Sequence, residues 1–260
     1  MIPYIEIPPF KIGPLVIQPF GFLVCVAIIL GGFLFHWRAR QVGLAREHVR
    51  NIFRICAFLG IFGSHVIHLV VYHPQTLARD PWSLLRFWDG MSSLGGFFSA
   101  FLFVSLYVRW KKIDFLPYAD AAVYAFVPLW MVARMGCAVV HDHPGRLTRF
   151  PLAVRFPDGP RHDLGLYEVF LSLLWIPLVL WLGRKKQIDD PPRGTILSVM
   201  SIAYAVPRFF LDFLRATDLP GHDVRYFGFT FAQYGCLLMI AAGGWFLWKQ
   251  RRSAGVPDPA

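Results

Sequence analysis

The chain has 260 residues, a mean hydropathy of +0.48 and 16% charged residues, whereas soluble domains have roughly 25%. This composition indicates a membrane protein. The formal net charge of +10 does not indicate nucleic acid as a partner, because the basic residues cluster in short loops between apolar runs and we find no nucleic-acid-binding motif. The cysteines lie in apolar runs, without the paired spacing of a zinc site or a disulfide framework: Cys25, Cys56, Cys137 and Cys236.

Residues 1–18 are apolar but broken by prolines, so we expect an N-terminal arm at the membrane interface rather than a span. The following run, Phe20 to Phe35, lacks a basic n-region and a clear cleavage site, which favours a retained span over a signal peptide. A crossing needs about 20 mostly apolar helical residues. The candidate spans are residues 19–36, 52–72, 91–108, 119–140, 165–182, 194–211 and 228–248.

Basic residues orient these spans. They concentrate in alternate loops, and the positive-inside rule places those loops in the cytoplasm: Arg38, Arg40, Arg46, Arg50, Arg109, Lys111, Lys112, Arg184, Lys185, Lys186, Arg193, Lys249, Arg251 and Arg252. The sequence therefore predicts an all-α polytopic membrane protein of about seven transmembrane helices, forming a single domain over residues 1–260. Its N-terminus lies outside and its C-terminus in the cytoplasm.

Residues 141–164 form the main polar segment on the predicted outer side. They contain His141, His143 and His162, and their later part alternates apolar with small or charged residues. This alternation predicts a short extracytoplasmic hairpin. A histidine-bearing segment that follows Arg134 so closely is a candidate cover for a reaction centre.

Arg134 and Arg208 each lie within an apolar run. A guanidinium at membrane depth costs about 2.5 kcal/mol or more unless an anion or a polar cavity receives it. Its planar fork suits a phosphate, which membrane lipids carry. The alternative is purely structural: Arg134 pairs with a buried acid such as Asp120, and Arg208 pairs with Asp212 one helical turn away.

The sequence around Arg208 places several polar residues on one helix face. Tyr204, Arg208, Asp212 and Arg215 recur at helical spacing, and Pro207 is expected to loosen the helix just before Arg208. Elsewhere, His65 and His68 have the spacing to ligate a metal or haem, although such histidines more often hydrogen-bond to neighbouring helices.

Taken in chain order, these motifs resemble the bacterial prolipoprotein diacylglyceryl transferases. The resemblance runs along nearly the whole chain. It rests on Ile12-Gly-Pro-Leu-Val-Ile-Gln-Pro-Phe-Gly, Gly90-Met-Ser-Ser-Leu-Gly-Gly, Arg134-Met-Gly-Cys with Gly145, His162-Asp-Leu-Gly-Leu-Tyr-Glu168, the segment from Tyr204 to Arg215, and Phe227-Gly-Phe-Thr-Phe-Ala-Gln233.

The resemblance implies a diacylglyceryl-transferase-like fold in the bacterial inner membrane. It also implies transfer of a diacylglyceryl group from phosphatidylglycerol to the lipobox cysteine thiol of preprolipoproteins, with release of glycerol phosphate and without a metal or an organic cofactor. The implied catalytic residues are Arg134 and Arg208, with His141, His143 and His162 as candidate bases and His162 favoured. The implied substrate-binding residues are Arg134, Arg208, Tyr204, Gly145, Gly95, Gly96, Tyr167, Glu168 and Gln233.

The chain departs from the family pattern at three positions. The histidine that precedes Gly-Gly in the family is Leu94, the signature asparagine is Cys137, and a tyrosine near the first span is Phe20. Leucine cannot transfer a proton. Four alternatives therefore stay open: the histidine is dispensable to the reaction, another base serves, the chain transfers a lipid-derived group to another acceptor, or it binds lipid without catalysis.

Overall fold

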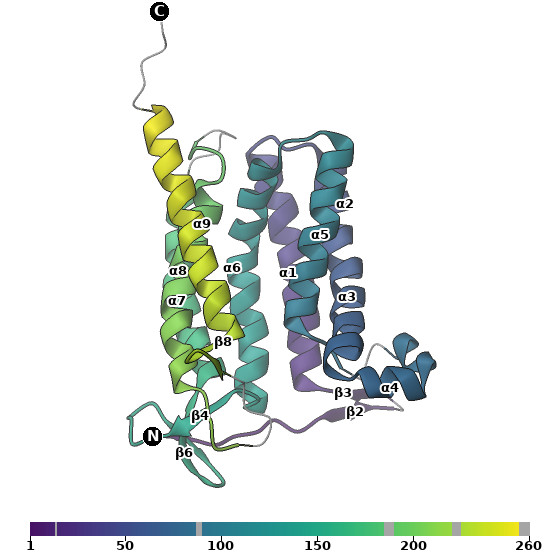
Figure 1. Ribbon diagram of the computed structural model, residues 1–260, viewed down its shortest axis with the longest axis vertical. Helices are drawn as coiled ribbons and strands as arrows, with labels where there is room; N and C mark the ends of the chain where they lie inside the picture. The colour runs from purple at the N-terminus through teal and green to yellow at the C-terminus, as the bar shows by residue number, and fades with distance from the viewer. Residues whose placement is uncertain (14, 87–89, 185–189, 220–224, 255–260) are drawn as a thin grey trace, which may run out of the picture. The chain divides into compact units, whose positions relative to one another are not determined.

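A computed structural model describes residues 1–13, 15–86, 90–184, 190–219 and 225–254 (Figure 1). Its α-helices are α1 (Pro19–Gln41), α2 (Arg46–Arg54), α3 (Gly60–Ile67), α4 (Pro74–Arg79), α5 (Ser93–Lys111), α6 (Phe115–Val140), α7 (Leu164–Leu182), α8 (Thr195–Leu211) and α9 (Phe231–Ala254). Short strands are β1 (Ile2–Pro3), β2 (Phe10–Ile12), β3 (Leu15–Ile17), β4 (Pro144–Leu147), β5 (Val154–Phe156), β6 (Gly159–Asp163), β7 (Arg225–Tyr226) and β8 (Phe229–Thr230).

Within the described residues, 6 helical segments are long and apolar enough to cross a membrane: Pro19–Gln41, Arg46–Val71, Phe115–Val140, Leu164–Leu182, Thr195–Leu214 and Phe231–Arg252. Helix α5, with 19 residues, covers most of the additional predicted span 91–108. The predicted class, a multi-pass helical membrane protein, is confirmed. The number of seven spans and the orientation of the termini stay predictions.

The helices tolerate local irregularity inside their apolar runs. Two π-helical turns, Ile55–Leu59 and His68–Tyr72, continue α2 and α3 without a break, so one segment covers the predicted span 52–72 and begins earlier. Helix α8 continues through Pro207 to Leu211, and a 3-10 turn, Asp212–Leu214, follows. Pro207, which was expected to loosen the helix just before Arg208, does not end the helix there.

The chain forms two compact units, residues 1–38 with 119–260 and residues 39–118. The prediction of a single domain stays a prediction. In the first unit, buried Tyr124, Trp175, Val179, Ile196 and Met200 form one apolar cluster that joins α6, α7 and α8. Helix α9 packs along α8, as Figure 1 shows. The candidate site described below belongs entirely to this unit.

A small sheet lies at one end of the first unit, beside the N-terminus (Figure 1). Its strand order is β1-β5-β6-β4, with β1 parallel to β5 and the other pairs antiparallel. The pair β5–β6 is the hairpin predicted within residues 141–164, and β1 comes from the predicted N-terminal arm. The hairpin is therefore confirmed as a structure, whereas its position outside the membrane stays a prediction.

Arg161 on β6 links several parts of the chain around this sheet by hydrogen bonds. Its guanidinium donates to carboxylate oxygens of Asp158 and Asp218 at 2.6 Å each and to the carbonyl of Gly145 at 3.1 Å. These hydrogen bonds to carboxylates lower the pKa of Asp158 and of Asp218. Strand β4, which carries Gly145, is thus tied to β6 by a side chain as well as by its backbone.

In the second unit, α3 packs closely against α5. A Cβ added to Gly95 would lie 2.5 Å from the Cβ of Ile67 and 3.0 Å from the carbonyl oxygen of Gly63. A Cβ added to Gly63 would meet the Ser99 side chain at 1.8 Å. Small residues therefore permit this helix crossing, as expected for close-packed membrane helices.

Candidate active site

The site begins at the C-terminal end of α6. Arg134 and Cys137 lie in its last turns, and the helix ends at Val140. His141 follows in a left-handed conformation (φ 50°), and Pro144 shortly after cannot extend a helix. The chain therefore turns back, and Asp142 and His143 come to lie beside the end of the helix that they follow.

Glu168 on α7 joins the two arginines. Arg134 Nε lies 2.8 Å from Glu168 Oε2, and Arg208 Nε lies 3.5 Å from Glu168 Oε1. The side chains of Arg134, Arg208 and Glu168 are 12%, 7% and 2% exposed. Helices α6, α7 and α8 thus bring together residues that are far apart in the sequence.

Asp212 forms a second junction immediately after α8. Its Oδ1 accepts from Arg208 Nη1 at 2.6 Å and from Arg215 Nε at 2.8 Å, while the Thr230 hydroxyl donates to Oδ2. Arg225 also donates to the backbone carbonyl of Asp212 at 2.9 Å. The predicted alternative, an internal Arg208–Asp212 ion pair, is therefore confirmed, and this pair is part of a larger network.

The network carries an excess of positive charge. Arg134, Arg208 and Arg215 contribute three cations, whereas Glu168 and Asp212 contribute two anions, which leaves one positive charge among these five side chains. The Arg134 Nε–H does not point along its contact with Glu168, and among the described residues neither Arg134 Nε nor Glu168 Oε2 has a hydrogen-bond partner. Buried polar atoms usually have one, so the Arg134 Nε–H and the excess positive charge suit an additional anionic ligand, whereas Glu168 Oε2 would accept from a hydrogen-bond donor.

Aromatic rings line the arginines. The guanidinium carbon of Arg134 lies 4.4 Å from the centroid of the Trp130 ring, within the range of a cation–π contact. Tyr204 packs edge-on against Trp130 at 5.9 Å and against Trp175 at 5.5 Å between ring centroids. The predicted residue Tyr204 is therefore placed between α6, α7 and α8, one helical turn before Arg208.

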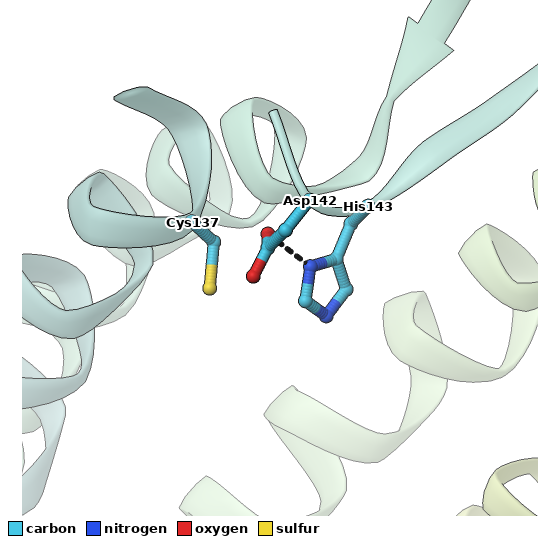
Figure 2. A group of neighbouring side chains, drawn as sticks. All are labelled: Cys137, Asp142 and His143. Carbon is cyan, nitrogen blue, oxygen red and sulfur yellow. Dashed lines mark hydrogen bonds and ion pairs between the residues drawn. The ribbon is translucent and has the colours of Figure 1, made fainter. Parts of the chain in front are cut away.

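Cys137, Asp142 and His143 form a compact group next to Arg134. Figure 2 shows the three side chains reaching toward one another from the last turn of α6 and from the segment that enters β4. One ligating atom of each lies within 4.8 Å of the others. His143 Nδ1 is hydrogen-bonded to Asp142 Oδ1, while Arg134 Nη1 lies 3.4 Å from His143 Nε2 and 3.5 Å from Cys137 Sγ.

The environment of His143 favours its protonated form. Burial lowers the pKa of this imidazole, but hydrogen bonds to Asp142 and Cys137 and the negative charge of Asp142 outweigh burial and the opposing charge of Arg134, raising the pKa to about 9. His162 differs, since burial lowers its pKa. Near neutral pH, His162 is therefore mostly neutral and His143 mostly protonated.

A family model for prolipoprotein diacylglyceryl transferase matches residues 9–249. The chain belongs to the prolipoprotein diacylglyceryl transferase family. Relatives named phosphatidylglycerol–prolipoprotein diacylglyceryl transferase include one from Nitratidesulfovibrio vulgaris, 29% identical over 99% of this chain and 99% of the relative. A second, from Chromohalobacter salexigens, is 29% identical over 97% and 96%, and a third, from Legionella pneumophila, is 27% identical over 96% and 100%.

In this diacylglyceryl transferase family member, the three candidate bases have different partners. His143 contacts Arg134, as described above. His141 Nδ1 lies 2.5 Å from Asp163 Oδ2, and its ring stacks on Tyr4. His162 Nδ1 lies 2.9 Å from the hydroxyl of Tyr167. The prediction favoured His162, but its hydrogen bond joins it to Tyr167 rather than to either arginine.

The alternative that Arg134 pairs with a buried acid is confirmed, but the acid named as an example is wrong: Arg134 pairs with Glu168 instead of Asp120. The Asp120 carboxylate accepts hydrogen bonds from the backbone N–H groups of Gly194 at 2.6 Å and Leu197 at 2.7 Å. Both donors belong to the start of α8, whose first N–H groups have no partner within the helix. Asp120 thus caps another helix of this chain, and the sequence gives no indication of this contact because the residues lie far apart along it.

Several predicted binding residues have clear structural roles. A Cβ on Gly145 would lie 2.6 Å from the carbonyl oxygen of Leu214 and 2.7 Å from the Cβ of His162, so only glycine fits where β4 bridges to Arg215. Gln233 and Thr230 form a capping box at the start of α9, with Gln233 N–H donating to Thr230 Oγ1 at 3.3 Å and Thr230 N–H donating to Gln233 Oε1 at 2.9 Å. The Thr-x-x-Gln spacing in the sequence is the pattern typical of a capping box.

The remaining predicted residues, Gly95, Gly96 and His65, lie in the second unit. Gly95 and Gly96 face Gly63, Ile67, Gly60 and Ser64 at the α3–α5 crossing. His65 Nδ1 and Nε2 lie 2.8 Å and 2.9 Å from the carbonyl oxygens of Gly90 and Ser83, which removes support from haem ligation. The side chain of Leu94 lies outside the described residues. The substrate-binding role of Gly95 and Gly96 stays a prediction.

Proposed function

We propose that this protein transfers a diacylglyceryl group from phosphatidylglycerol to the lipobox cysteine of preprolipoproteins in the bacterial inner membrane. Membership of the family and the names of its relatives support this function. The observation that carries it is the excess positive charge buried where Arg134 and Arg208 share Glu168. A phosphodiester bears one negative charge, which would neutralise that excess.

The arginines act on the phosphate of the lipid in this scheme. The bond that breaks joins the glyceryl carbon to a phosphate oxygen, and negative charge grows on the departing glycerol phosphate. Guanidinium N–H groups held by Glu168 and Asp212 are oriented before the reaction begins, so they stabilise the developing charge without reorganisation. The thiolate of the acceptor cysteine forms the new carbon–sulfur bond.

The preference for both substrates follows from the same chemistry. A lipid without a phosphate would leave the arginine network without its counterion. The acceptor is a cysteine because its thiolate is a far better nucleophile than its thiol. The scheme requires no metal or organic cofactor, and nucleic acid has no role in it.

The test uses purified protein, phosphatidylglycerol and a lipobox peptide with a single cysteine. Mass spectrometry detects the diacylglyceryl thioether. We expect Arg134→Ala to reduce the rate by at least about 100-fold, the loss typical when one donor to a developing anion is removed. Arg146→Ala, on the exposed part of β4, is the matched control and should retain activity. Full activity in Arg134→Ala, or lipid turnover without any peptide thioether, would contradict the proposal.

A further inference from the structure

The acceptor thiol of the proposed reaction must lose its proton, and the family histidine is replaced by Leu94 in this chain. Cys137, in the place of the family asparagine, adds a thiol beside Arg134. Asp142 and His143 bring a carboxylate and an imidazole to the same place (Figure 2). Thiolate, imidazole and carboxylate are the ligands that zinc takes from proteins, so these three side chains form a candidate metal site.

The three donors are close enough to share one zinc ion. One ligating atom of each lies within 4.8 Å of the others. Two ligands of a tetrahedral zinc, bonded at about 2.0–2.3 Å, lie about 3.5 Å apart, so the donors need to approach by little more than about 1 Å. The side chains of Asp142 and His143 are 39% and 24% exposed, which leaves them free to make this movement and gives an ion a path from water. Cys137 is buried, and a Cβ on Gly165 would lie 3.1 Å from its Cβ.

The number of ligands is typical of a reactive zinc site. Among the described residues, the group contains three metal-binding side chains. Structural zinc sites have four protein ligands, whereas catalytic sites have three and leave the fourth position to water or a substrate. A thiol that coordinates the metal is deprotonated outright. A zinc ion held here would therefore ionise the acceptor thiol without a histidine at position 94.

The net charge of such a site is compatible with Arg134. Without a metal, a protonated His143, an ionised Asp142 and the thiol of Cys137 sum to zero. Zinc takes the place of the two protons, and its two positive charges balance the carboxylate and the new thiolate. Arg134 therefore faces zero net charge in both states. Its Nη1, which lies 3.4 Å from His143 Nε2 and 3.5 Å from Cys137 Sγ, has to turn away, and the lipid phosphate is the partner that would receive it.

We propose that Cys137, Asp142 and His143 bind a zinc ion whose open fourth position takes the lipobox cysteine as a thiolate. The inference rests on the proposed function and adds a metal to a transfer scheme that otherwise requires none. Because Arg134 Nη1 borders two of the ligands, a thiolate bound there lies next to the phosphate that the arginine holds. The metal thus brings the nucleophile to the lipid as well as ionising it.

The reaction balances in protons, electrons and charge. The lipobox thiol releases its proton to water when its sulfur binds zinc. The sulfur then forms a bond to the glyceryl carbon, and the bond between that carbon and the phosphate oxygen breaks, with its electron pair leaving on glycerol phosphate. The thiolate and the phosphodiester bring one negative charge each, and the departing phosphate monoester carries both. The thioether product is uncharged, so it binds zinc more weakly than the thiolate and leaves the open position.

Metal binding is measured first, without turnover. Purified wild-type protein should bind one zinc ion per chain, and Cys137→Asn and His143→Gln should each lose it. Cobalt(II) in the same site should show an absorption band from its bond to the Cys137 sulfur. A lipobox peptide should strengthen this band by adding a second thiolate, whereas the same peptide with serine in place of its cysteine should not. This response separates a thiol-binding metal from a structural one.

Transfer is then measured near neutral pH before and after a chelator removes the metal. An unassisted thiol, with a pKa of about 8.5, is only about 3% ionised at pH 7, whereas a metal-bound thiol is ionised completely but is less nucleophilic than a free thiolate. Metal removal should therefore slow wild-type thioether formation by at least about 10-fold, and zinc should restore the rate. Cys137→Asn and His143→Gln should show the low rate with or without zinc.

Cys236→Ser is the matched control. It removes a thiol that is similarly buried, with 4% of the residue exposed against 6% for Cys137, and it should keep both the zinc ion and the wild-type rate.

Three outcomes would overturn the zinc site while the transferase function stands: full transfer by the metal-free wild-type protein, zinc that inhibits instead of restoring, or a cobalt spectrum that ignores the cysteine peptide. None of these depends on how well a variant folds, because each is observed in the wild-type protein. Absence of transfer by folded, zinc-loaded wild-type protein, beside an active relative as positive control, would instead reject the proposed function.

Discussion

At the scale of single residues, Glu168 is the side chain that joins the two arginines. Its two carboxylate oxygens face Arg134 and Arg208, and the side chain is 2% exposed. Sequence motifs indicated Glu168 as a substrate-binding residue, but they did not indicate that it holds the two arginines together. Removing one partner from a buried ion pair leaves an uncompensated charge, which costs more than the pair contributes.

Glu168→Gln tests this role. The substitution keeps the shape but removes the shared anion, so the excess charge of the network rises and the arginines repel each other. We expect the free energy of unfolding to fall by about 3–5 kcal/mol, together with a loss of transfer activity. Thermal unfolding in detergent measures the first effect. Glu47→Gln on the exposed face of α2 is the control, and an unchanged Tm in Glu168→Gln would contradict the assignment.

At the scale of elements, glycines set how closely the helices of the second unit approach. Gly63 and Gly95 face each other across the α3–α5 crossing, where an added Cβ would meet Ser99 and Ile67. The run of small residues beginning at Gly90 is typical of closely packed membrane helices. It does not identify the partner helix, because small residues permit close approach by any helix.

Gly95→Ala should therefore destabilise the protein by about 1–3 kcal/mol, the usual cost of overpacking, although alanine favours a helix. Gly235→Ala on α9 is the matched control. A Cβ at Gly235 meets nothing within 4 Å, so the same substitution there should leave stability unchanged or raise it by up to about 1 kcal/mol. The Tm of both variants decides the matter, and equal shifts would argue against a packing role for Gly95.

At the scale of the whole molecule, the distribution of basic residues predicts the orientation in the membrane. The helical segments provide crossings, and the sheet of β1, β5, β6 and β4 gathers the N-terminal strand and the 144–163 region at the same end of the first unit. The positive-inside rule places the arginine-rich C-terminal end of α9 in the cytoplasm and therefore this sheet outside.

Reporter fusions test the orientation. Alkaline phosphatase, which is active only outside the cytoplasm, should be active when joined within the β5–β6 hairpin and inactive when joined after Ala260. A cytoplasmic fluorescent protein should show the reverse pattern. Active phosphatase at both positions would mean that the number of crossings between them is even, which contradicts the predicted seven spans.

The sequence alone was sufficient for the membrane class, the approximate positions of the spans and the placement of Arg134 and Arg208 within apolar helices. Hydropathy and charge act locally along the chain, and an arginine in an apolar run is visible without knowledge of its neighbours. Tertiary structure was needed to identify Glu168 as the partner of Arg134, Asp120 as a cap for α8, and His143 as the histidine beside Cys137. These contacts join separate helices or depend on how the chain turns after α6, and such proximity has no periodic signature in the sequence.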